Sequence, residues 1–410
     1  MIVAMAATLA GVLTRVTRLR HRRREVQFGL SVLAAIVCTI LALQTLNRAW
    51  RPDGIDFTSY LMSARALWEG RSPYGLDTPW PYVYPMLLAL LLTPLIALPY
   101  TAAVLAWFVV SVAALAGIVV KTTNRAVLPI VITLVAGFAI VQSTLLNGQV
   151  NFLVVLCSVL AVCAAHERRD IAAGAWLGAG IALKLMPIVL GVYFLVRRRW
   201  IALVATGAAA LLFSFGPAVL LGARGWDVCV EYVRGYVLPM LAGSPVHRED
   251  PLVYSVSGIA HAVLGASAPA SINVVSALAV VGAATALDVF VWRRRRRDLA
   301  AGAGYMIAVV LVSSKSELHH LVFIIPAIGL GATWLLSQPD RARPWAAAIF
   351  VTAVAAIALS KLAGPAQGLV ICAALFMLGA GLAGLTPPSA SPQESPHSSS
   401  SSPSCRAAVP

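Results

Sequence analysis

Charged side chains are scarce in this 410-residue chain. Asp, Glu, Lys and Arg make up 11% of the residues, whereas 60% are hydrophobic. An ordinary soluble domain carries about 25% charged residues. This composition excludes a soluble globular domain and indicates a polytopic membrane protein, whose core is the bundle of spanning helices itself.

Acidic residues are scarcer than basic ones: Asp and Glu number 16 and Lys and Arg 31, giving a net charge of +15. Such a charge can indicate nucleic-acid binding. Here, however, the basic residues form short runs between apolar stretches, at 18–24, 168–169, 197–199, 293–297 and 341–343. This distribution is typical of cytoplasmic loops under the positive-inside rule. We therefore expect membrane lipids, and no nucleic acid, among the partners.

Several motifs of other protein classes are missing. The six cysteines include no Cys-x-x-Cys pair, which favours single thiols over a disulfide or metal framework. There is no Asp-x-Asp pair and no Gly-rich phosphate loop after a strand. A metal-dependent, nucleotide-sugar enzyme of the soluble type is therefore disfavoured, and we expect neither a metal nor a cofactor.

Long apolar runs predict an all-α, polytopic transmembrane bundle of about 10–13 spans within residues 26–385, because a spanning helix needs about 20 residues. Residues 1–25 are expected to form a basic cytoplasmic N-terminus. Residues 386–410 are Ser/Pro-rich and are expected to form a disordered cytoplasmic tail. The runs lie near 27–47, 101–120, 127–146, 150–165, 201–221, 271–292, 300–313, 321–337, 345–361 and 366–384.

Two further apolar stretches leave the topology open. Residues 171–196 have basic flanks on both sides, which favours a two-helix hairpin broken near Lys184–Pro187. Residues 85–99 are short and interrupted by prolines, which favours a half-span. Treating 85–99 as a full crossing and 171–196 as one span gives a similar number of spans but inverts residues 121–170. The first arrangement keeps Arg168 and Arg169 inside.

An amphipathic helix is predicted in the first outer loop. Beginning at Phe57, apolar residues recur at offsets typical of one helical face and end at Trp68; Gly70 then stops the helix. The segment is too short and too charged to span, so we expect it to lie at the interface, with Tyr60 and Trp68 among the lipid headgroups. Asp56 lies at its N-terminus. There it can serve as a helix cap or, as an ionised carboxylate, as a general base.

Several motifs follow one another along the chain. They are Asp56, Gly70-x-x-Pro73-Tyr74, Tyr84-Pro85, Asn147-Gly-Gln-Val-Asn151, Gly178-x-x-x-x-x-Lys184-x-x-Pro187, and a Ser-rich turn ending in His319-His320. Their order resembles glycosyltransferase family 87 (DUF2029), integral-membrane GT-C enzymes that include polyprenyl-phosphate-mannose-dependent α-mannosyltransferases and an arabinofuranosyltransferase. The resemblance covers about residues 30–340.

This resemblance implies a GT-C fold, a catalytic Asp that maps onto Asp56, a late His that maps onto His319 or His320, and a sugar donor carried on a lipid phosphate. The chain departs from the family at two points. It reads Ser314-Lys-Ser-Glu-Leu where the family turn has Ser-Pro and Trp, and Tyr254-Ser-Val-Ser-Gly258 in place of an Asn-Gln-Ser-like segment.

Other candidate site residues each have a plainer alternative. Asp53 competes with Asp56 as base or is a loop charge. Lys184, inside an apolar run, contacts the donor phosphate or extends to headgroups, and Lys315 is a second phosphate candidate. Asn147 and Gln149 bind sugar hydroxyls or join helices. Tyr84 stacks on a sugar or belongs to the interfacial aromatic belt.

The sequence thus predicts a metal-independent hexosyltransferase of the inner membrane. It would move a sugar, mannose by default, from a polyprenyl-phosphate donor to a glycolipid or cell-envelope glycan on the outer face. A flippase for a lipid-linked sugar and a non-catalytic relative are the alternatives. Paired broken helices or inverted repeats would favour transport, and no repeat is visible at a fixed period.

Overall fold

The computed structural model describes residues 23–78, 80–241, 254–265, 271–293, 298–313, 316–337 and 343–385, and these residues form helices without any strand. The predictions for residues 1–22, for the tail from 386 and for Lys315 lie outside these ranges. The α-helices are α2 Arg23–Ala49, α3 Asp56–Trp68, α4 Met86–Leu92, α5 Tyr100–Thr123, α6 Val127–Ala136, α7 Phe138–Leu146, α8 Asn151–His166, α9 Asp170–Leu183, α10 Leu190–Val196, α11 Trp200–Leu221, α12 Ala223–Tyr232, α13 Leu238–Leu241, α14 Val256–Leu264, α15 Ile272–Leu287, α16 Asp298–Val312, α17 Ile325–Ser337, α18 Pro344–Ala358 and α19 Gln367–Leu385. Short 3₁₀ or π segments are η2 Thr93–Ala97, η3 Met186–Val189, η4 Val233–Val237, η6 Asp288–Arg293, η7 Leu318–Ile324 and η9 Ser360–Ala366.

The multi-pass helical architecture predicted from the apolar runs is confirmed. Within the described residues, 6 helices are long and apolar enough to cross a membrane, beginning with Phe28–Ala49. A seventh span is possible if α6 and α7, which meet at a 66° bend, are counted as one. The remaining predicted spans correspond to shorter apolar helices of 10–17 residues, including α8, α16 and α18.

The stretch from Asp170 to Val196 is a broken hairpin, as its basic flanks predict. α9 ends at Leu183, Lys184 is extended, and the chain resumes as η3 and α10. The two ends of the hairpin are close together, because Arg199 at the start of α11 pairs with Asp170 at the start of α9 (Nη1–Oδ1 2.5 Å). Lys184 therefore lies at the tip of the hairpin.

The hairpin packs tightly on α11. Gly174 approaches Ala202 and Ala205, and Gly178 approaches Ala209 one turn further on, so α9 and α11 run in the same direction. A β carbon at either glycine would collide with the α11 backbone. Small residues at this seam allow the two helices to approach closely, as in other membrane bundles.

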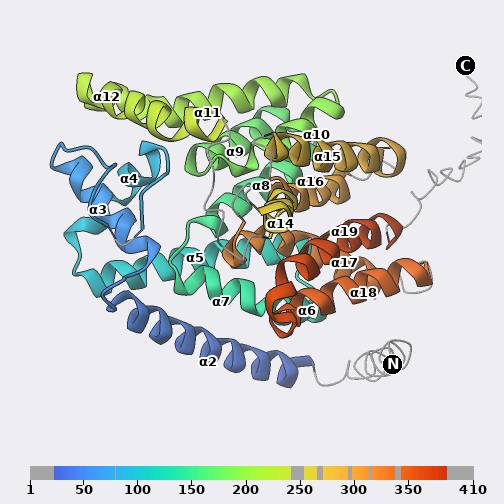
Figure 1. Ribbon diagram of the computed structural model, residues 1–410. Helices are drawn as coiled ribbons and strands as arrows, with labels where there is room; N and C mark the ends of the chain where they lie inside the picture. The colour runs from blue at the N-terminus through green and yellow to red at the C-terminus, as the bar shows by residue number, and fades with distance from the viewer. Residues whose placement is uncertain are drawn as a thin grey trace, which may run out of the picture.

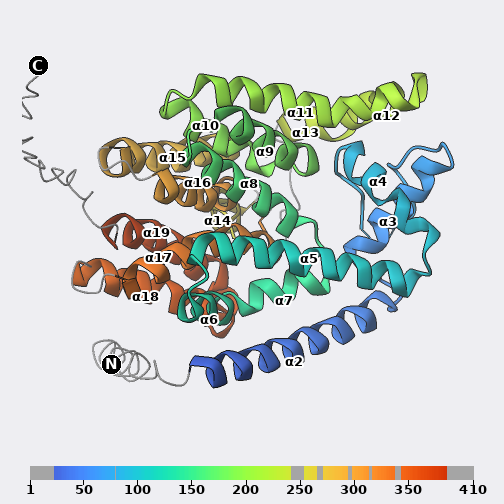
Figure 2. The same cartoon turned by 180° about the vertical axis from the view of Figure 1, so that it is seen from behind.

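The bundle has two chemically different ends. Figure 1 shows the long helices running side by side, with α3, α4 and α12 gathered at one end, and Figure 2 shows the same arrangement from behind. At the other end, Arg197 pairs with Asp288 (2.6 Å) and with Asp298 (2.8 Å). α8 runs between these two ends of the bundle. Its 16 residues correspond to about 24 Å at the usual rise per residue.

Residues 85–99 do not form a full-length span. α4 and η2 together cover Met86–Ala97 as a short apolar helix, as expected for a half-span. α4 packs beside α3, and this pair caps the end of the bundle in Figures 1 and 2. The loop between them carries Tyr84 into the interior.

Candidate active site

Asp56 is the first residue of α3 and does not cap the helix. The capping position belongs to Ile55, whose backbone N–H donates to Thr58 Oγ1 (3.2 Å), while the Thr58 N–H donates back to the Ile55 carbonyl (2.9 Å). The cap position that the sequence offered to Asp56 is therefore occupied by Ile55. Asp56 is half-buried.

The apolar face of α3 is buried, and this corrects one expectation. Phe57, Ala64 and Leu67 are at most 4% exposed, and Tyr60 is only 1% exposed. The prediction that Tyr60 lies among the lipid headgroups is therefore wrong, whereas Trp68 is 73% exposed. The helix pattern identified the buried face but not the protein segment that covers it.

Gln149 links Asp56 to the tyrosines of this region. Its Oε1 atom lies 3.1 Å from the Tyr60 hydroxyl and 3.4 Å from the Tyr84 hydroxyl, so it accepts hydrogen bonds. The amide N–H₂ group is then available to donate to the Asp56 carboxylate, and hydrogen bonding from the Gln149 side chain lowers the pKa of Asp56. An interfacial-belt role for Tyr84 does not fit, because the residue is buried, with 6% of its surface exposed.

Gly148 allows the turn that carries Gln149 to approach α3. Its φ is +63°, and a β carbon there would lie 2.7 Å from Phe57 Cβ. The Gly148 carbonyl accepts from Trp107 Nε1 (2.7 Å), and the Trp107 ring stacks on Phe57. Only glycine fits both the left-handed backbone and the close approach.

The environment of Asp56 makes it a stronger base than a surface aspartate. Burial raises the pKa of Asp56 to about 6, and the negative charge of Glu317 acts in the same direction. The positive charge of Lys184 and the hydrogen bond from Gln149 oppose this rise. The carboxylate is thus mostly ionised at neutral pH and still able to take up a proton.

Lys184, at the hairpin tip, holds its ammonium group among three neighbours. Nζ lies 2.9 Å from Asn151 Oδ1 and 2.9 Å from His320 Nε2, and 5.5 Å from the centre of the Tyr84 ring. A lysine that only extended to headgroups would not have these partners. The contacts bring together α8, the break after α9 and the turn before α17.

The two histidines have different surroundings. The Glu317 N–H donates to His320 Nδ1 (3.0 Å), which turns the other ring nitrogen of His320 toward Lys184. His319 Nδ1 lies 3.7 Å from the Glu317 carboxylate, and its backbone carbonyl accepts from Asn151 Nδ2 (2.9 Å). His320 is therefore the histidine that joins the Lys184 cluster.

Three sequence candidates lie apart from this cluster or outside the described residues. Asp53 is exposed. Asn147 is partly buried, and its Nδ2 reaches Ser143 Oγ on its own helix at 3.5 Å. Lys315 lies outside the described residues.

Sequence reasoning did not select Tyr60, Asn151 and Glu317, although the structure brings them into the cluster. A signal was present for two of them. Asn151 closes the Asn147–Asn151 motif, and Glu317 belongs to the Ser-rich turn before the histidines. Neither position could be ranked without knowing which distant side chain it meets.

The two segments that depart from the family pattern contact each other. The Tyr254 N–H donates to the Ser316 carbonyl (2.7 Å), and Tyr254, Ser255 and Ser257 are at most 2% exposed. Ser255 caps α14 by accepting from the Gly258 N–H (3.1 Å). The turn that carries His320 is thus buttressed by the start of α14.

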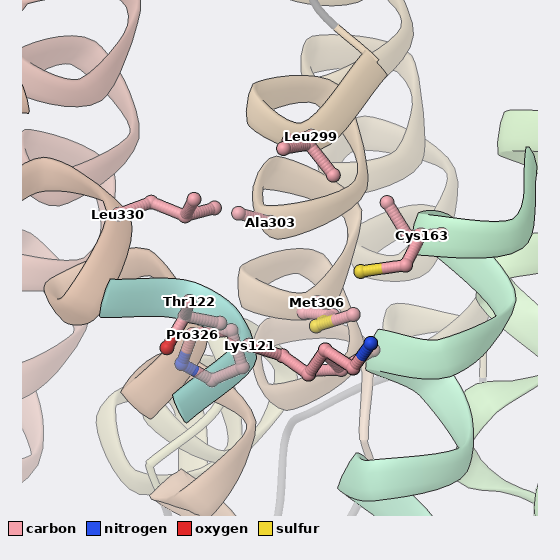
Figure 3. A pocket seen from close by; sticks show the side chains of 10 residues that line it. Lys121, Thr122, Cys163, Leu299, Ala303, Met306, Pro326 and Leu330 are labelled. Atoms are coloured by element: carbon pink, nitrogen blue, oxygen red, sulfur yellow. The ribbon is translucent and has the colours of Figure 1, made fainter. Parts of the chain in front are cut away.

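A small pocket lies elsewhere, toward the end of α8 away from Asn151. Figure 3 shows Lys121, Cys163, Met306 and Leu330 around it, from α5, α8, α16 and α17. None of the candidate site residues lines this pocket. Within the described part of the chain, no group of three or more His, Cys, Asp or Glu is arranged to hold a metal ion.

Comparison with known proteins gives consistent matches. The family model described as Glycosyltransferase family 87 matches residues 82–314, which is more than half of the chain. A polyprenol-phosphate-mannose-dependent alpha-(1-2)-phosphatidylinositol mannoside mannosyltransferase of Mycobacterium tuberculosis is 32% identical over 346 residues, covering 74% of this chain and 77% of the relative. A phosphatidylinositol pentamannoside mannosyltransferase of Mycolicibacterium smegmatis, with the same donor in its name, is 30% identical over 75% of this chain and 74% of the relative. Among solved structures, ArnT from Cupriavidus metallidurans in the apo state covers 88% of this chain and 77% of its own, with 16% identity and a TM-score of 0.45.

Proposed function

Since the chain belongs to glycosyltransferase family 87, we propose that it transfers mannose from a polyprenyl-phosphate-mannose donor to a glycolipid acceptor of the phosphatidylinositol mannoside type. The observation that carries this proposal is that the Asp56 carboxylate feels the charge of Lys184, whose ammonium lies 2.9 Å from His320 Nε2. The names of the relatives support the choice of donor and acceptor.

Asp56 is proposed as the general base. It removes the proton from an acceptor hydroxyl as that oxygen attacks the anomeric carbon of the donor, with inversion. A pKa of about 6 suits this role, because the group is largely ionised at neutral pH yet basic enough to share a proton in the transition state. Hydrogen bonding from the Gln149 side chain favours the ionised form of this carboxylate.

Lys184 and His320 are proposed to receive the leaving lipid phosphate. As the bond between the anomeric carbon and the phosphate oxygen breaks, negative charge grows on the phosphate. A preorganised cation in a water-poor site, here the Lys184 ammonium, stabilises such charge strongly. Asn151 and Glu317 already orient these two groups, so little reorganisation is needed during the reaction. This charge is available from the chain itself, and we propose that transfer is independent of metal ions.

The site is proposed to face the outer side of the inner membrane. The Arg runs at 168–169 and 197–199 lie at the opposite level of the bundle, where Arg199 pairs with Asp170. Basic loops remain on the cytoplasmic side. A separation of about 24 Å along α8 accounts for most of a hydrocarbon layer about 30 Å thick, which leaves Asp56 close to the far boundary.

The test is transfer of radiolabelled mannose in membranes that contain equal amounts of wild type, Asp56→Asn or Asp53→Asn. The probes are polyprenyl-phosphate-mannose and phosphatidylinositol mannosides. We expect Asp56→Asn to lower transfer by about 100- to 10,000-fold, the range for loss of a general base. Asp53→Asn is the matched control, because Asp53 is exposed and separate from the cluster.

The outcomes separate the alternatives. Equal activity of Asp56→Asn and wild type would contradict the proposed base, and loss with Asp53→Asn alone would move that role to the loop. If wild type makes no product with any phosphatidylinositol mannoside, the acceptor or the sugar is wrong. Movement of the lipid-linked sugar across vesicles without transfer would instead support the flippase alternative.

A further inference from the structure

Asn151 is fully buried, and both ends of its side chain are engaged. It is the first residue of α8 and 0% exposed. Its Oδ1 accepts from Lys184 Nζ (2.9 Å), and its Nδ2 donates to the His319 carbonyl (2.9 Å). A single amide therefore connects the hairpin tip to the histidine turn.

We propose that Asn151 is a positioning residue for sugar transfer, which fixes the Lys184 ammonium relative to the turn that carries His320. This inference rests on the proposed function. Because its side chain is buried and its polar atoms are engaged, Asn151 acts through Lys184 and the turn without touching the substrate.

The chemistry of the amide explains why asparagine suits this position. A lysine side chain has many rotamers, and each must be suppressed for the ammonium to meet a phosphate at a fixed place. An amide offers an acceptor at one end and a donor at the other. A carboxylate has no donor for the His319 carbonyl, and an aliphatic side chain has neither group.

The neighbouring asparagine of the same motif shows the contrast. Asn147 reaches only Ser143 of its own helix, at 3.5 Å. Asn151 bridges residues that lie 33 and 168 positions away in the chain. The motif thus contains an asparagine that serves its local turn and another that holds distant parts of the site together.

A double-mutant cycle tests the proposal. Donor kcat/KM is measured for wild type, Asn151→Ala, Lys184→Met and the double variant. We expect Asn151→Ala to lower kcat/KM by about 10- to 100-fold, the size expected for losing a hydrogen bond to a charged group. In the Lys184→Met background the same substitution should have a much smaller effect, since the group that it positions is gone. Equal effects in both backgrounds would overturn the proposal.

Asn151→Asp adds a readout that a purely structural role would not move. The new carboxylate still accepts a hydrogen bond from Lys184. Its negative charge, however, neutralises the Lys184 ammonium and repels a phosphate. The donor KM should therefore rise more than in Asn151→Ala; an unchanged donor KM would contradict the role.

Ser158→Ala is the control for damage to α8, because Ser158 is equally buried and bonds only to Val154 of its own helix. It should retain wild-type kcat/KM. A loss there as large as in Asn151→Ala would indicate helix damage and overturn the proposal. If the wild type shows no transfer, the proposed function is contradicted. If the wild type is active and Asn151→Ala has the same kcat/KM, only the role of Asn151 is contradicted.

Discussion

The pH dependence of transfer tests the base directly, because burial places the pKa of Asp56 at about 6. A general base acts in its deprotonated form, so activity should fall as pH falls through this value. With a pKa of about 6, roughly nine tenths of the carboxylate is ionised at pH 7 and roughly one tenth at pH 5. We therefore expect donor kcat/KM to drop about tenfold between pH 7 and pH 5.

The fall in donor kcat/KM below about pH 6 is the acidic limb of the pH profile. Neighbouring charges should move this limb in opposite directions. The positive charge of Lys184 lowers the pKa of Asp56, so Lys184→Met should shift the limb to higher pH. The negative charge of Glu317 raises the pKa of Asp56, so Glu317→Gln should shift it to lower pH. The position of the limb is informative even where these variants also reduce the maximal rate.

The assay is initial-rate transfer in detergent-solubilised membranes from pH 5 to pH 8. The donor is a phosphodiester and keeps its charge over this range. His320→Gln serves as the control, because it leaves the Asp56 carboxylate intact and should retain an acidic limb. A flat profile in wild type, or loss of the limb in His320→Gln, would refute the assignment of the limb to Asp56.

Three further predictions concern stability and local geometry. Gly148→Ala should lower the free energy of unfolding by about 2–4 kcal/mol, because it adds left-handed strain and a collision with Phe57, and it should also reduce transfer. Gly75→Ala is the control, since Gly75 has a φ of +65° but open space around it. Thermal unfolding in detergent measures the stability of both variants. Arg197→Met should lower stability by about 3–5 kcal/mol, because it removes the guanidinium partner of the buried Asp288, whereas exposed Arg198→Met should have little effect. Asp56→Asn should raise the free energy of unfolding at pH 7 by up to about 3 kcal/mol. The pKa of Asp56 is higher in the folded protein, so its ionised carboxylate destabilises the fold above pH 6. The gain from Asp56→Asn should therefore shrink as the pH falls toward 5.

Much of the fold could be predicted because apolar length and basic flanks carry most of the information in a membrane bundle. The span predicted at 201–221 is α11, Trp200–Leu221, and the break predicted near Lys184 is present. The span predicted at 127–146 is instead bent by 66° between α6 and α7, at Gly137. The hydropathy of that stretch is continuous, so nothing in the apolar pattern indicates the bend.

The site was predictable where a residue stands out against an apolar background. Lys184 and His320 are conspicuous for this reason, and the structure brings them within 2.9 Å of each other. Asn151 is not conspicuous, because its importance lies in partners that are distant in the sequence. Tyr60 was misplaced for a related reason: periodicity identifies the apolar face of a helix, and only tertiary packing decides what covers it.

The candidate site lies where regular helices are interrupted, and the membrane explains why. Asp56 begins a helix, Lys184 occupies the extended break after α9, and His320 lies in the 3₁₀ segment before α17. Irregular backbone in a bilayer is tolerated only where protein or a polar cavity satisfies it. Breaks that meet at one level can satisfy each other, as the Asn151 amide does for the His319 carbonyl. The groups that complete the backbone hydrogen bonding are then the ones that orient the charged side chains, so substitutions at this level should affect both stability and transfer.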